Sequence, residues 1–132
     1  MTSRTRRVTG LVLAAALVAG AAGVAAQTVR LQQLMRAKLG HAEALLEAVV
    51  TSDWDELEIR ALALDDITRE PEWAVLPSRE YAERSEAFRD AVQALVTASR
   101  ARDLDAVAMA YVDTTLSCVA CHREIALARQ AR

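Results

Sequence analysis

Both cysteines of this 132-residue chain lie in one short segment near its end, Cys118-Val119-Ala120-Cys121-His122. A C-x-x-C-H segment is the attachment motif for a c-type haem. On a helix, Cys118, Cys121 and His122 occupy positions i, i+3 and i+4 and therefore share one face. The two thiols can add to the two vinyl groups at one edge of a porphyrin, and the imidazole can bind the iron as proximal ligand. The spacing predicts one covalently bound haem c.

Other uses of the two cysteines stay open. A C-x-x-C redox pair is typical of a βαβ context, and no strand pattern flanks this segment. A structural zinc site needs four ligands, whereas the motif supplies three and the other histidine, His41, is far away in the sequence. Two buried, inert thiols are the least specific outcome, because free cysteines are commonly buried. A haem-free thiol module or interaction bundle is therefore the alternative to a haem protein.

The first 26 residues have the pattern of an export signal. A basic start with three arginines precedes an unbroken run of small and apolar residues over 11–24, and Ala25-Ala26 provides small residues for cleavage before Gln27. We expect a signal peptide over 1–26, a mature domain over 27–132 and a periplasmic location. The apolar run is shorter than the ~20 residues that span a bilayer, and an uncleaved N-terminal anchor is the alternative.

The charge of the mature chain limits its partners. Cleavage would remove three arginines and no acidic residue, so the formal net charge of −2 would fall by three, to −5. Nucleic-acid binding needs a basic surface, so we expect no nucleic-acid partner. A mildly acidic surface can steer a basic redox protein. No residues suggest a substrate pocket with a general acid and base, and we expect no enzymatic activity.

The mature chain is predicted to be all-α. After residue 26 it has one glycine and two prolines and is rich in Ala and Leu, a composition that favours helices. Helices are expected from about Thr28 to Val50, and after the N-caps Asp53, Ser78 and Asp103. Four amphipathic helices with short connections predict an antiparallel four-helix bundle.

Each expected helix has one apolar face. The stripe of the first helix is Leu31, Leu34, Met35, Ala42, Leu45, Leu46 and Val49, with Arg30, Arg36, Lys38 and Glu43 mostly off it. The inner face of the third helix is Tyr81, Ser85, Phe88, Val92 and Leu95. In the fourth helix, Leu104, Val107, Tyr111 and Thr114 lead down one face to Cys118, Cys121, His122 and Ile125.

With these residues placed, the sequence resembles the class II c-type cytochromes, the cytochrome c′ family. Members are exported four-helix bundles with C-x-x-C-H near the C-terminus, whereas most c-type cytochromes have it near the N-terminus. The resemblance covers 27–132 as an architecture, and its specific matches are Cys118, Cys121 and His122. It implies a haem-mediated electron carrier with a transient redox partner, and a homodimer that pairs through exposed helix faces.

The resemblance also implies that the first helix supplies the residue on the open side of the iron. This residue is apolar in five-coordinate members, and in low-spin relatives it is a methionine whose sulfur binds iron. Leu34-Met35-Arg36 is similar to the methionine-ligated relatives, so Met35 is the expected distal ligand. Its alternative is core packing. With Leu34 facing the iron, the site would be five-coordinate and bind NO or CO, and His41 is a third candidate.

Further haem contacts rest on the same resemblance. Arg30 is a candidate partner for a haem propionate, because guanidinium pairs well with carboxylate, and its alternative is a solvated surface arginine. Trp73 lies in the connection where family members often place a tryptophan near the haem edge, with simple packing as the alternative. The family often has an aromatic residue and an arginine three and four places after the motif histidine. Ile125 and Ala126 occupy these positions here and depart from that pattern. The sequence therefore does not show which charged residue lies beside the proximal ligand.

Overall fold

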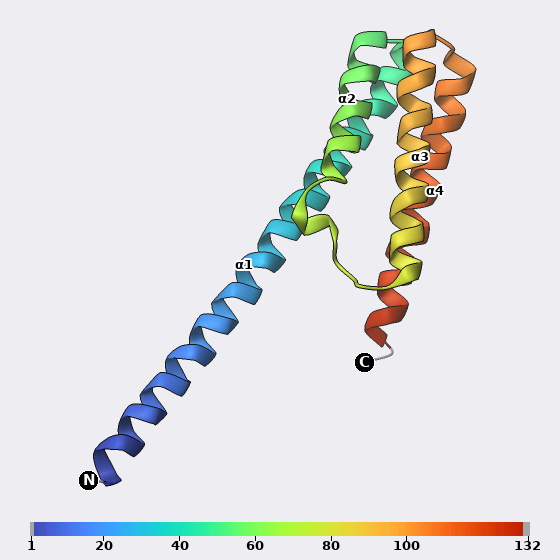
Figure 1. Ribbon diagram of the computed structural model, residues 1–132. Coiled ribbons are helices and arrows are strands. Elements are labelled where there is room, and N and C mark those ends of the chain that lie inside the picture. Colours follow the sequence, from blue (N-terminus) through green and yellow to red (C-terminus); the bar gives the residue numbers. More distant parts are fainter. Residues whose placement is uncertain (1, 131–132) are drawn as a thin grey trace. The chain divides into compact units, whose positions relative to one another are not determined.

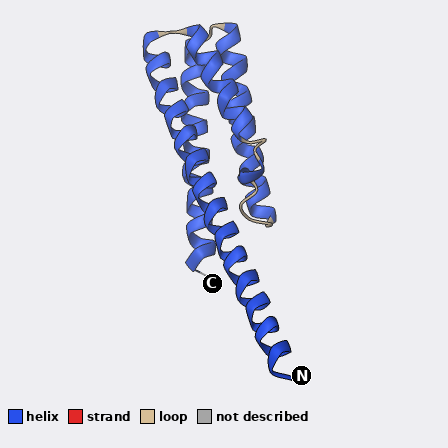
Figure 2. Ribbon diagram, turned by 90° about the vertical axis from the view of Figure 1, so that its left-hand side faces the viewer, coloured by secondary structure: helices blue, strands red, loops and turns tan. Residues whose placement is uncertain are grey.

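The computed structural model describes the backbone of residues 2–130 and the side chains of residues 26–130. Its helices are α1 (Thr2–Thr51), α2 (Trp54–Ile67), α3 (Arg79–Ala101) and α4 (Leu104–Gln130), with a 3₁₀ helix η1 (Pro71–Trp73) between α2 and α3. Figure 2 shows how short the remaining connections are. Residues 2–130 contain no strand, so the expected all-α class is confirmed.

The chain divides into two compact units, Met1–Gln33 and Leu34–Arg132, and the boundary between them lies within α1. In the first unit the backbone is helical from Thr2, so the prediction of a helix that begins near Thr28 is wrong. The physical reason is that the apolar segment consists mainly of Ala, Leu and Val without proline, and nothing in it stops a helix. Cleavage before Gln27 stays a prediction.

The second unit is an antiparallel four-helix bundle made by residues 34–51 of α1 together with α2, α3 and α4 (Figure 1). Helix α3 packs against both α2 and α4. Helix α4 is tied to α1 by the Tyr111 hydroxyl, which donates a hydrogen bond to the Ala42 carbonyl at 3.2 Å. The predicted bundle is confirmed.

The three predicted N-caps are all present. The side chains of Asp53, Ser78 and Asp103 each accept a hydrogen bond from the backbone N–H three residues later, at 3.0–3.1 Å. Such a bond satisfies one of the free N–H groups at a helix start. Ser52 and Arg102 precede two of these caps with φ of 56° and 54°, which turns the chain sharply between helices.

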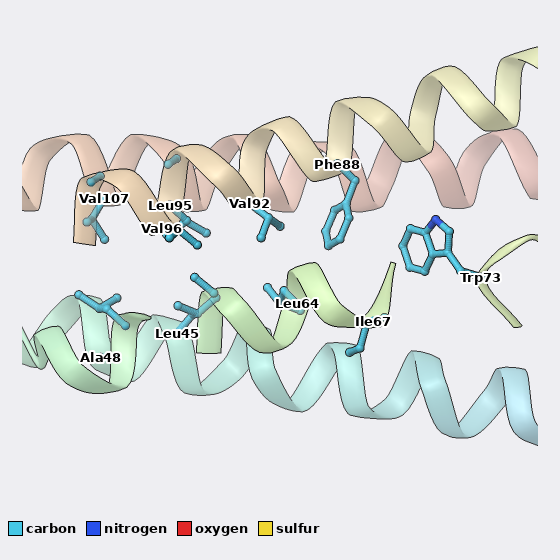
Figure 3. Packing of buried hydrophobic residues seen from close by; sticks show 14 residues of the cluster. Leu45, Ala48, Leu64, Ile67, Trp73, Phe88, Val92, Leu95, Val96 and Val107 are labelled. Atoms are coloured by element: carbon cyan, nitrogen blue, oxygen red, sulfur yellow. The ribbon is translucent and has the colours of Figure 1, made fainter. Parts of the chain in front are cut away.

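The core of the bundle is formed by apolar side chains of all four helices and η1 (Figure 3). Its buried members are Leu45, Ala48, Leu57, Ala61, Leu64, Ile67, Trp73, Phe88, Val92, Leu95, Val96, Ala98, Val107 and Ala110. The predicted inner face of α3 is confirmed in full.

Two assignments on α1 are wrong. Leu46, placed on the inner stripe, is 50% exposed, and Lys38, placed off it, is only 7% exposed. The reason is the helical period. Steps of three and four residues from Met35 lead through Lys38 to Ala42 and Leu45, and Leu46 lies one residue beyond that line.

Helix α4 has an apolar outer face as well as an inner one. Met109 is 64% exposed, which confirms that it points away from the motif, whereas Leu104 was expected inside and is 40% exposed. The helix is long and apolar enough to cross a membrane, with a mean hydropathy of 1.3. Core helices of soluble proteins often meet this criterion, and in this chain α4 packs against α3 as a bundle helix.

Candidate functional site

The C-x-x-C-H segment lies on α4, in the half nearer the C-terminus. Cys121 points inward and is buried, Cys118 is half-buried, and His122 is exposed. The two cysteines are free thiols. The helix therefore presents both sulfur atoms and an accessible imidazole along one side, as the i, i+3, i+4 spacing predicts.

A groove of about 340 Å³ runs beside this segment, between α1 and α4. Its lining residues are Met35, Arg36, Lys38, Leu39, Ala42, Cys118 and His122. Two of the expected iron ligands thus face the same space from different helices. Leu34 packs against the core and is not among the lining residues.

Lys38 is the residue at this site that the sequence analysis missed. Its ammonium lies 3.7 Å from the centre of the Phe88 ring and 4.7 Å from that of Trp73. The two rings are 5.4 Å apart with a tilt of 30°, and Figure 3 shows them as neighbours. The contacts are cation–π interactions, which partly replace the water that a lysine loses on burial.

Burial dominates the electrostatics around the thiols. It lowers the pKa of Lys38, while the nearby Cys118 and Cys121 thiols act in the opposite direction. Burial also raises the pKa of Cys121, which the Lys38 ammonium counteracts in part. Cys121 is therefore held as a thiol rather than a thiolate near neutral pH, and a thiol is the weaker nucleophile.

A hydrogen bond to its backbone carbonyl helps to position Trp73. The Tyr81 hydroxyl donates a hydrogen bond to the Trp73 carbonyl, and η1 directs the indole into the core, where it is 5% exposed. Its Nε1–H has no hydrogen-bond partner within residues 26–130. Packing in the bundle is confirmed for Trp73, and its place at a haem edge stays a prediction.

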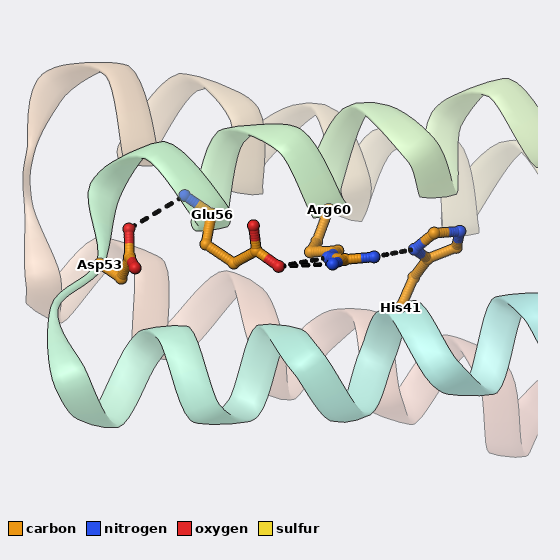
Figure 4. Close-up of polar contacts among 4 residues, drawn as sticks. All are labelled: His41, Asp53, Glu56 and Arg60. Atoms are coloured by element: carbon orange, nitrogen blue, oxygen red, sulfur yellow. Dashed lines mark hydrogen bonds and ion pairs between the residues drawn. The ribbon is translucent and has the colours of Figure 1, made fainter.

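His41 points toward Arg60 of α2 (Figure 4), and it is not among the residues that line the groove. Its Nδ1 lies 3.3 Å from a guanidinium nitrogen of Arg60, and Arg60 also pairs with Glu56 at 2.6 Å. Burial, and then the Arg60 charge, lower the pKa of His41. The structure thus gives His41 a place in a polar contact between α1 and α2.

Arg30 is exposed and lies in the unit Met1–Gln33, so its pairing with a propionate stays a prediction. Of the two positions that depart from the family pattern, Ile125 is half-buried and Ala126 is exposed. Within the part of the chain whose side chains are described, no group of three or more His, Cys, Asp and Glu is gathered to hold a metal ion by itself.

Comparison with known proteins identifies the fold. No protein-family model matches the chain, and no curated protein matches its sequence. A solved structure of cytochrome c′ matches with a TM-score of 0.64 and 21% identity, over 74% of this chain and 92% of that one. The reduced structure of a mutant cytochrome c′ from Alcaligenes xylosoxidans matches with a TM-score of 0.63 and 22% identity, over 74% and 90%. The chain therefore has the four-helix fold of cytochrome c′, and the resemblance seen in the sequence is confirmed at the level of the fold.

Proposed function

We propose that this protein is an exported c-type cytochrome that transfers electrons through one covalently bound haem c. Cys118 and Cys121 form its thioether bonds, His122 is the proximal iron ligand and Met35 the sixth ligand. The observation that carries the proposal is the groove that Met35 and His122 line together with Cys118. The cytochrome c′ fold supports it.

The residues around the groove fit a haem. Two cysteines, a histidine and a thioether sulfur are the donor set that attaches and ligates haem c. Leu39 and Ala42 supply apolar surface for the flat face of a macrocycle. The residue types and their placement on facing helices thus suit this cofactor.

The bound haem supplies a one-electron iron centre, and the chain determines how that centre behaves. Methionine ligation through Met35 favours the reduced iron and raises the reduction potential. The exposed side of α4 at His122 gives a transient redox partner a short path to the centre, and the acidic surface attracts a basic partner. The groove lining includes no carboxylate, and we propose electron carriage without an enzymatic activity.

The chemistry of Cys121 supports attachment before folding. In the closed bundle its thiol is buried and its pKa is raised, so it reacts slowly with an alkene. In an unfolded chain both thiols are accessible, and the pKa of Cys121 is no longer raised by burial. This order of events fits export of an unfolded chain directed by residues 1–26, followed by haem attachment and bundle closure.

The alternative function is a five-coordinate haem that binds NO or CO. The cytochrome c′ fold supports it equally well, and the apolar Leu39 and Ala42 could wall an open distal side. In that case Met35, which also packs against the core, does not bind the iron. In either form, a homodimer would use exposed apolar faces such as the outer face of α4.

Covalent attachment is the direct test. The chain is expressed with and without haem c attachment machinery, purified, denatured and stained for haem on a gel. We expect haem to stay with the chain only when the machinery is present. A double variant, Cys118→Ala with Cys121→Ala, should lose it. A wild-type chain without covalent haem would overturn the proposal in favour of a haem-free thiol module.

A further inference from the structure

Lys38 carries a positive charge into the bundle, next to the two thiols. The side chain starts on α1 and lines the groove, and only 7% of the residue is exposed. Its amine forms a hydrogen bond with Cys118 and is also acted on by the Cys121 thiol. Water and salt screen exposed charges strongly and buried charges weakly. A charge at this position therefore acts strongly on a group that is bound beside the thiols.

Two aromatic rings hold the ammonium at this place. It lies 3.7 Å from the centre of the Phe88 ring on α3 and 4.7 Å from that of the Trp73 ring on η1. Both aromatic residues are buried, and the Tyr81 hydroxyl donates a hydrogen bond to the Trp73 carbonyl. Burial lowers the pKa of Lys38 from an ordinary value far above neutral, 10.5. The two cation–π contacts oppose that loss, because they favour the protonated amine over the neutral one.

The attachment chemistry brings this charge to one edge of the haem. Thioether bonds to Cys118 and Cys121 hold the vinyl edge of the macrocycle at two sulfur atoms that neighbour the Lys38 amine. A thioether has no proton to lose, so the two sulfurs stay uncharged in both oxidation states of the iron. The ring contacts of Lys38 involve neither sulfur and do not depend on the free thiols. The cation is therefore not neutralised by the groups that attach the haem.

We propose that the Lys38 ammonium acts as a buried cation at the vinyl edge of the haem and raises its reduction potential. The inference rests on the proposed haem and deepens the proposed electron-transfer function. Reduction adds one electron to the iron, and a nearby cation stabilises the added negative charge. The sign of this effect is the same whether or not Met35 binds the iron. The charge of Lys38 and the donor atom of Met35 therefore contribute separately to the potential.

The test compares the wild-type haem-loaded protein with four variants by spectroelectrochemical titration near neutral pH. Lys38→Met and Lys38→Gln remove the charge and keep an unbranched side chain, whereas Lys38→Arg keeps the charge. Arg36→Met is the matched control, because Arg36 also lines the groove from α1 but is exposed. Each reduction potential is measured at low and at high salt, and each spectrum reports the spin state of the iron.

We expect Lys38→Met and Lys38→Gln each to disfavour the reduced form by about tenfold, which for one electron lowers the potential by about 59 mV. This loss should persist at high salt, because salt screens a buried charge only weakly. Lys38→Arg should stay close to the wild-type potential. Arg36→Met should cause a much smaller loss that disappears at high salt, because water and ions screen an exposed charge.

Two results would overturn the inference. One is a loss of potential in Lys38→Met no larger than that in Arg36→Met, which would mean that the amine is neutral or remote from the haem. The other is a changed spin state in Lys38→Met, which would mean that the amine binds the iron directly. Lys38→Gln decides the question in the same way if Lys38→Met does not fold. Absence of covalent haem from the wild-type chain would instead overturn the proposed function, so the two failures are distinguishable.

Discussion

Met35 on α1 and His122 on α4 line one groove, although they lie near opposite ends of the bundle sequence. Antiparallel helices bring them to the same level of the bundle. Of the three distal candidates in the sequence, Met35 faces this groove, Leu34 packs against the core and His41 contacts Arg60. Met35 is therefore the proposed sixth ligand, and like Leu34 it also packs against the core.

Replacing Met35 should leave the sixth coordination position of the iron vacant. We expect Met35→Leu to keep covalent haem, to become high-spin and to bind carbon monoxide when reduced, because leucine has no donor atom. Absorption spectra of the reduced protein with and without the gas measure this. Met109→Leu is the control, since Met109 is exposed on the outer face of α4. An unchanged spectrum in Met35→Leu would mean that Met35 is core packing.

Replacing His122 should leave the haem attached but without its proximal ligand. In His122→Ala the two thioether bonds remain, and the exposed position of the side chain gives added imidazole access to the iron. We expect a changed spectrum that imidazole restores. His41→Gln removes the other histidine and should keep the wild-type spectrum. Loss of the wild-type spectrum in His41→Gln alone would place the ligand on α1 instead.

The His41–Arg60 contact should make stability depend on pH. The pKa of His41 is lowered below its ordinary value of 6.5 by burial and by Arg60. Between these two pKa values the unfolded chain binds more protons than the folded one, so folding stability falls as pH drops through about 6.5 and is fully present above it. Denaturant titrations should show a flatter profile below pH 6.5 for His41→Gln. An identical profile would contradict this role.

A substitution at Leu64 tests the placement of the hydrophobic core. Leu64 is fully buried in the last turn of α2, and Leu64→Ala should cost about 2–5 kcal/mol of unfolding free energy through lost burial and a residual cavity. Leu62→Ala, on the same helix but 38% exposed, should cost clearly less. Equal losses in chemical denaturation of the two variants would contradict the placement of the core.

Local signals explain why much of the fold could be predicted. The caps at Asp53, Ser78 and Asp103 depend on a side chain and a backbone group three residues apart, so the sequence contains all that is needed. The inner face of α3 follows from one clear helical period. The start of α1 was predicted too late because the helix was taken to begin after the expected cleavage site. The apolar leader and the amphipathic helix in fact join without a residue that breaks the helix.

The burial of Lys38 could not be predicted from its residue type. Lysine is almost never fully buried, and a charged residue on an amphipathic helix is normally assigned to the solvent side. Its spacing was nevertheless informative, because it lies three residues after Met35 and four before Ala42, in step with the apolar stripe. What no sequence pattern shows is the pair of rings from η1 and α3 that receive its ammonium.

The absorption spectrum of the purified protein, oxidised and reduced, before and after addition of carbon monoxide, tests the central claim most directly. Covalent haem ligated by His122 and Met35 predicts low-spin spectra in both oxidation states and no change on adding the gas. A high-spin spectrum that shifts with carbon monoxide would contradict ligation by Met35 and leave the gas-binding function. A protein with no haem spectrum at all would contradict the whole account.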